Sequence, residues 1–139
     1  MVIVVGVDGS ETAFRAAEVA AEFARALGAS LHIVSAYQHQ NRHEVVGTGD
    51  DRWFVGDADL AVSAASNTAS RLSGGDLETT TATPHGKPAA MLIEEANRLD
   101  ARMIVVGNHR MQGAGRLLGS VANSVAHHAP CDVHIVKTT

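Results

Sequence analysis

The sequence predicts an α/β fold, a Rossmann-like three-layer sandwich with a five-stranded parallel sheet in the order 3-2-1-4-5 and helices on both faces. Short β-branched runs alternate with alanine-rich stretches of helical length, a pattern typical of parallel sheets. The apolar runs are nearly continuous, as in strands that are covered on both faces. Right-handed crossovers favour the stated strand order. At 139 residues, the chain is long enough for one domain, residues 1–139.

A strand, a helix and a second strand are expected first. Val2 to Val7 is an apolar run. Ser10 is a suitable N-cap for a helix from Glu11 to Leu27, and Gly28 is a suitable end. The second strand is expected from Leu31 to Tyr37. The helix residues expected to face inward are Ala13, Ala17, Ala20, Ala24 and Leu27.

A long connection, about residues 38–56, then breaks the pattern with polar residues and three glycines. A connection of this length is typically functional or mobile. It contains Trp53 and Phe54, two of only five aromatic residues. These two side chains could form a lid over a crevice, contact a partner subunit or fill a satellite core, and the satellite core is favoured.

Three helices and three strands are expected in the second half. In chain order they are a helix from Asp57 to Leu72, an edge-like strand from Glu78 to Thr83, a helix from Pro88 to Leu99, a strand from Met103 to Val106, a helix from Ser120 to Ala129 and a strand from Val133 to Val136. The first of these helices is expected to face inward with Leu60, Ala61, Ala64, Ala65, Thr68 and Leu72. Glu94 and Arg98 have the spacing of an ion pair between residues i and i+4.

A ligand crevice is expected where the strand order reverses, at the C-terminal ends of the first and fourth strands. The loops there are Asp8-Gly9-Ser10 and the stretch GNHRMQGAGRLLGS, residues 107–120. Its glycines allow backbone amides to approach a ligand and to adopt positive φ. Ser120 can cap the following helix or offer its hydroxyl to a phosphate, and Arg110 and Arg116 can add charge. The competing interpretation is a simple loop end and N-cap, with solvated arginines.

Composition disfavours several classes of function. The net charge of −4 and a pI near 6.0 disfavour nucleic-acid binding. No apolar run approaches the roughly 20 residues that span a bilayer. The start of the sequence lacks the pattern of a signal peptide, so we expect a cytoplasmic protein.

Neither a metal site nor a catalytic constellation is predicted. The eight histidines lack ligand spacing, and His127 and His128 suit the negative end of a helix dipole. Cys131 is expected to be a small buried hydrophobe rather than a redox sensor. Without a nucleophile motif, the protein is not expected to be a dedicated enzyme, although weak ATP hydrolysis or autophosphorylation stays compatible with ATP binding.

The whole chain resembles the universal stress proteins of the UspA type. The resemblance rests on VVGVDGSETAFRAAEVAAEFA, on HGKPAAMLIEEA and, most specifically, on VVGNHRMQGAGRLLGSVANSVAHHAPCDVHIVK. It implies a Rossmann-like fold and a homodimer through the last strand. It also implies binding of ATP, with or without Mg²⁺, or of another adenine nucleotide such as cyclic AMP. The strand residues implied at the dimer seam are Val133, His134, Ile135 and Val136.

The loop departs from the family pattern Gly-x2-Gly-x9-Gly-Ser/Thr. Gly107 matches the first glycine, Arg110 replaces the second, and Gly119-Ser120 arrives one residue early. The Arg110 side chain could block the backbone approach that a glycine permits. Alternatively, Gly113 or Gly115 could replace the missing glycine, or Arg110 could itself meet a phosphate. Position 122, which often carries a hydroxyl in nucleotide binders of the family, is an alanine.

The resemblance places Asp8 near the adenine or ribose and Ala36 in the adenine pocket, while Asp8 also suits a turn former. The predicted nucleotide-binding residues are Val7, Asp8, Gly9, Ala36, Gly107, Arg110, Gly113, Gly115, Gly119, Ser120 and Val121. The predicted function is a stress-response regulatory protein that binds an adenine nucleotide, ATP before cyclic AMP. The alternative is a nucleotide-free dimeric interaction protein of the same family.

Overall fold

A five-stranded sheet forms the centre of the computed structural model, which describes residues 1–38, 44–46, 53–55, 57–108 and 118–138. Its strands are all parallel and lie in the order β5-β2-β1-β6-β7. This order confirms the predicted arrangement 3-2-1-4-5 and places β5 at an edge. The strands are β1 (Val2–Gly6), β2 (Ser30–Val34), β5 (Thr79–Ala82), β6 (Met103–Asn108) and β7 (Asp132–Lys137).

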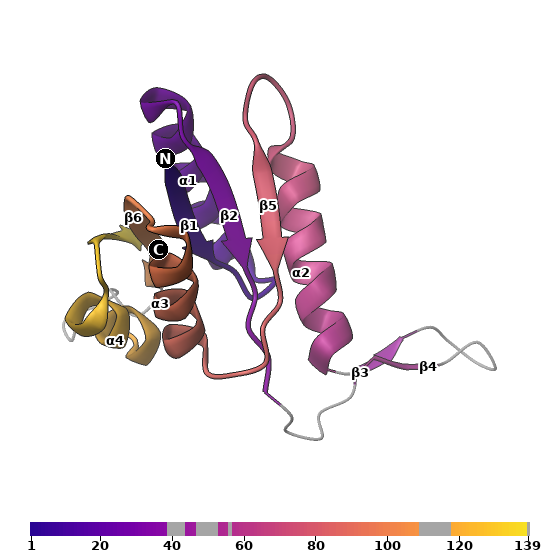
Figure 1. Ribbon diagram of the computed structural model, residues 1–139. Helices are drawn as coiled ribbons and strands as arrows, with labels where there is room; N and C mark the ends of the chain where they lie inside the picture. Colours follow the sequence, from indigo (N-terminus) through magenta and orange to yellow (C-terminus); the bar gives the residue numbers. More distant parts are fainter. Residues whose placement is uncertain (39–43, 47–52, 56, 109–117, 139) are drawn as a thin grey trace.

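Helices cover both faces of the sheet, as predicted (Figure 1). The helices are α1 (Glu11–Leu27), α2 (Asp57–Leu72), α3 (Pro88–Leu99) and α4 (Ser120–His128). One apolar core lies between the sheet and the pair α1 and α2, and a second lies between the sheet and the pair α3 and α4. No helix in the described part of the chain is long and apolar enough to cross a membrane.

The bounds of α1 follow from its capping residues. The Ser10 hydroxyl oxygen accepts a hydrogen bond from the Ala13 amide at 3.1 Å, and Gly28 ends the helix at φ +66°. Five alanines of α1 are buried, so the helix packs closely on the sheet. Two inward predictions were wrong, because Leu27 is 44% exposed and Leu60 of α2 is 36% exposed. Both lie near the ends of their helices.

Side chains alternate between the two faces along β1 and β6. Val5 and Val105 belong to the core under α1, and Val4 and Ile104 belong to the core under α3 and α4. Gly6, one residue beyond Val5, therefore faces the α3 side. A Cβ atom there would lie 2.9 Å from Leu92 Cδ1, so α3 approaches the sheet too closely for a side chain at this position.

Part of the long connection is regular, contrary to the sequence analysis. β3 (Glu44–Val46) and β4 (Trp53–Val55) pair antiparallel in a two-stranded sheet separate from the main one. The valines and aromatic residues of these segments favour strand pairing. The prediction of a satellite core for Trp53 and Phe54 concerns side chains that lie outside the described residues.

A buried polar network joins β2, β5 and α3. The His32 ring, 4% exposed, lies 2.6 Å through Nδ1 from Thr80 Oγ1 and 2.9 Å through Nε2 from Glu95 Oε1. Arg98 donates from Nε and Nη2 to the two Glu95 oxygens at 2.7 and 3.1 Å. The bonds from Arg98 and His32 lower the pKa of Glu95 to about 2, although burial opposes this effect. Arg98 thus pairs with Glu95. The spacing had predicted Glu94 as its partner, and this prediction was wrong.

Candidate functional site

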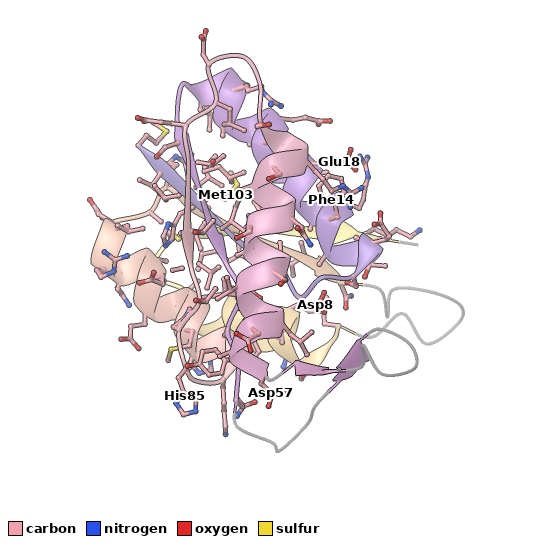
Figure 2. The ribbon with its side chains drawn as sticks, turned by 90° about the vertical axis from the view of Figure 1, so that its right-hand side faces the viewer. Asp8, Phe14, Glu18, Asp57, His85 and Met103 are labelled. Carbon is pink, nitrogen blue, oxygen red and sulfur yellow. The ribbon has the colours of Figure 1, made fainter. Side chains whose placement is uncertain are left out.

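A cavity of about 230 Å³ lies at the C-terminal ends of β1 and β6, where the chain turns toward α1 and α4. This is the predicted switch point of the sheet. In Figure 2, Asp8 lies below Met103, toward the end of the molecule where His85 is labelled. The cavity is lined by Gly6, Val7, Asp8, Ser10, Thr12, Ala13, Val34, Ala36, Pro88, Leu92, Val106, Gly107, Asn108, Gly119, Ser120, Val121 and Ala122.

The wall beside β1 is a turn stabilised by Asp8. Asp8 Oδ1 accepts hydrogen bonds from the Ser10 amide at 2.9 Å and from the Ser10 hydroxyl at 2.6 Å. Gly9 between them has φ +88°, a conformation that favours glycine. Ser10 Oγ in turn caps α1, because it accepts a hydrogen bond from the Ala13 amide at the N-terminus of that helix. Asp8 is thus a turn former and also lines the cavity.

The opposite wall is the start of α4. Gly119 is its N-cap, with φ −65° and ψ 161°, and it has no side chain of its own to cap the helix. The sequence-based assignment of Ser120 as the cap was therefore wrong, because Ser120 is already helical. The first helical bond of α4 runs from the Asn123 amide to the Gly119 carbonyl. The amides of Ser120, Val121 and Ala122 precede it, so they have no acceptor within the helix.

Asn108 connects the two parts of this wall. It is the last residue of β6 and is 2% exposed. Its Oδ1 accepts a hydrogen bond from the Gly119 amide at 2.8 Å. The end of a central strand is thereby joined to the N-cap of α4, eleven residues later in the sequence. The sequence analysis missed Asn108, although a polar residue at the end of a buried strand is a signal for a site residue.

Packing, and not backbone conformation, favours a glycine at position 107. A Cβ atom at Gly107 would lie 3.3 Å from the Thr12 carbonyl oxygen and 3.4 Å from Ala16 Cβ, both on α1. Gly107 is not among the described glycines with positive φ, and Gly119 has a negative φ. The expectation of positive φ at these two positions was therefore wrong.

Most of the predicted site residues that the structure describes come together. Those that line the cavity are Val7, Asp8, Ala36, Gly107, Gly119, Ser120 and Val121. Gly9 instead lines a hollow between α1 and α2. Arg110, Gly113 and Gly115 lie outside the described residues. Besides Asn108, the lining residues that were not predicted from the sequence include Thr12 and Leu92. Their place in the cavity depends on how α1 and α3 pack over the strand ends.

The cavity combines an apolar part with a polar end. Val34, Pro88 and Leu92 lie along the β2 and α3 side, and the open amides of α4 lie on the other. Asp8 is the one formally charged residue among the described lining residues at neutral pH. Helix N-termini carry a partial positive charge and favour anions. A flat apolar group joined to an anion matches this arrangement.

The surroundings of Cys131 and of His128 are typical of residues with a structural role. Burial and the nearby Asp132 carboxylate raise the pKa of the Cys131 thiol, which disfavours the reactive thiolate. His128 Nδ1 lies 3.0 Å from the Ser124 carbonyl oxygen near the end of α4. Among the described residues, no group of three or more His, Cys, Asp or Glu side chains is arranged to hold a metal ion.

Comparisons with known proteins match nearly the whole chain. The model of the universal stress protein family matches residues 1–137. A universal stress protein of Mycobacterium tuberculosis is 35% identical over 141 residues, which cover 99% of this chain and 96% of the relative.

Two solved structures of similar proteins hold adenine nucleotides. A universal stress protein in complex with cAMP is 32% identical and covers 100% of this chain and 98% of its own, with a TM-score of 0.72. The universal stress protein of Archaeoglobus fulgidus in complex with dAMP is 28% identical and covers 99% of this chain and 98% of its own, with a TM-score of 0.75.

Proposed function

This chain belongs to the universal stress protein family, and from that premise we propose that it binds an adenine nucleotide in the cavity between β1 and β6. The observation that carries the proposal is the N-terminus of α4, which opens on the cavity without a side-chain cap. Two similar proteins have been solved with cAMP and with dAMP, which supports the class of ligand.

The lining residues suggest how the nucleotide lies. The adenine ring packs against the apolar side of the cavity, which Val34, Pro88 and Leu92 line and where its burial is favourable. The ribose lies toward Asp8, whose carboxylate accepts hydrogen bonds from hydroxyl groups. The phosphate accepts hydrogen bonds from the amides at the start of α4 and from the Ser120 hydroxyl.

The number of phosphates is a separate part of the proposal. The sequence predicts ATP, with or without Mg²⁺, whereas the ligands of the two solved relatives each carry a single phosphate. The cavity of about 230 Å³ lies below the range of roughly 300–1,000 Å³ that is common for ligand pockets. On the ligands of these two relatives, we propose a nucleotide with one phosphate.

The biological role is proposed from the sequence. We propose that the protein is a cytoplasmic homodimer with a role in the stress response, and that it acts by binding and not by catalysis. β7 is an edge of the sheet within this chain. A second copy could pair there, since an uncovered edge otherwise promotes aggregation.

Calorimetric titration of nucleotide-stripped protein with AMP, cyclic AMP, Mg-ATP and adenosine tests the proposal. We expect saturable binding of at least one nucleotide. Ser120→Ala and Gly119→Val should weaken it by about tenfold or more, the effect of losing about 1.4 kcal/mol or more from contacts to a charged group. Ser66→Ala, the same deletion on the exposed side of α2, should leave it unchanged.

Two results would reject nucleotide binding at this site. One is the absence of saturable binding by any of the nucleotides, which favours the nucleotide-free interaction protein. The other is binding that neither α4 variant alters.

A further inference from the structure

We infer that Asn108 is a positioning residue for the phosphate of the bound nucleotide. It acts through the hydrogen bond that joins the end of β6 to the N-cap of α4. This inference rests on the proposed function and adds to it the residue that sets the orientation of the anion-binding amides.

Asn108 connects the end of β6 to the start of α4. Asn108 is the last residue of β6 and pairs with Lys137 of β7, so the sheet holds its backbone on that side. Its side chain is buried and reaches the Gly119 amide at 2.8 Å. Gly119 has no side chain of its own with which to cap the helix. The first turn of α4 is therefore connected to the sheet by a contact that comes from another element.

This contact leaves the amides of the first turn available to a ligand. At α1 the cap residue Ser10 accepts a hydrogen bond from the Ala13 amide, the third residue of that helix. At α4 the cap is a glycine, and Asn108 Oδ1 accepts a hydrogen bond from the amide of the cap residue itself. The following amides, of Ser120 and Val121, have no acceptor within the helix, and both residues line the cavity.

The neutral charge of Asn108 matters as much as its acceptor oxygen. An aspartate at this position could accept the same hydrogen bond from Gly119. It would also place a negative charge at the positive end of the α4 dipole, where the phosphate is expected. The carboxylate and the phosphate would then compete for the same partial charge and repel each other. An amide side chain holds the N-cap without this competition.

Asn108→Ala and Asn108→Asp separate the two properties. Binding of AMP and of adenosine, which lacks the phosphate, is measured for both variants by calorimetry together with the melting temperature. For Asn108→Ala we expect AMP binding about tenfold weaker, and adenosine binding within about twofold of the wild type. For Asn108→Asp we expect unchanged adenosine binding, and AMP binding weakened by more than in Asn108→Ala. Salt should reduce the Asp effect, because it screens charge repulsion.

Asn67→Ala is the matched control, because Asn67 lines the hollow between α1 and α2 and not this cavity. It should change neither affinity. Equal losses of AMP and adenosine binding in the Asn108 variants would mean a structural role alone and overturn the inference. Wild-type AMP affinity in Asn108→Asp would overturn it too, even if Asn108→Ala does not fold. Failure of the wild-type protein to bind AMP or any other nucleotide would instead refute the proposed function.

Discussion

Glu95 should stabilise the fold through its charge, and acid should remove this contribution. Arg98 and His32 hold the pKa of Glu95 near 2, below its ordinary value of 4.5. At about 1.36 kcal/mol for each pH unit, this difference corresponds to about 3 kcal/mol. Because the pKa is lower in the folded state, the stabilisation is complete above about pH 5 and is lost as the pH falls toward 2.

Glu95→Gln is the direct test, since glutamine resembles the protonated carboxyl group in size and charge. We expect the variant to unfold in urea with about 2 to 3 kcal/mol less free energy than the wild type at pH 7. By pH 3 the difference should fall below half of that value. Glu94→Gln is the control, because Glu94 is exposed on the same helix and Arg98 bonds to Glu95. A difference of the same size at pH 7 and pH 3 would refute the assignment of charge as the cause.

Three further changes test the packing around the cavity. The Thr138 hydroxyl is buried without a hydrogen-bond partner in the part of the chain that the structure describes. Thr138→Val should therefore raise the free energy of unfolding by about 1 kcal/mol. A lower melting temperature would contradict this. Gly107→Ala should cost about 1 to 3 kcal/mol, because the new Cβ would lie 3.3 Å from the Thr12 carbonyl oxygen, and urea unfolding measures it. Ser10→Ala should cost about 1 kcal/mol by removing the cap of α1, and a neutral result in the same assay would show that the cap adds nothing.

The bounds of three helices could be predicted because local residues determine them. Ser10 and Gly28 delimit α1, and Pro88 occupies the first turn of α3. These effects act over a few residues and are visible in the sequence. The alternation of strand and helix predicted the parallel sheet, and the preference for right-handed crossovers favoured its strand order.

The contacts at the site depended on residues far apart in the sequence. Asn108 bonds to Gly119, and the closeness of α1 favours a glycine at position 107. Arg98 pairs with Glu95 and not with Glu94, and Glu95 also contacts His32 on β2. Helical spacing alone does not distinguish the two glutamates, since the deciding neighbour is supplied by the tertiary fold.

Two helix N-termini border the same cavity, and their different caps give the proposed ligand a direction. At α1, Ser10 occupies an amide of the first turn, and the Asp8 carboxylate adds negative charge beside it. At α4 the cap is a glycine, and the following amides are not bonded to the cap. A phosphate is therefore repelled from the first helix and attracted to the second. On the proposed function, the ribose hydroxyls lie near Asp8 and the phosphate near Ser120, so the two helix caps orient the nucleotide.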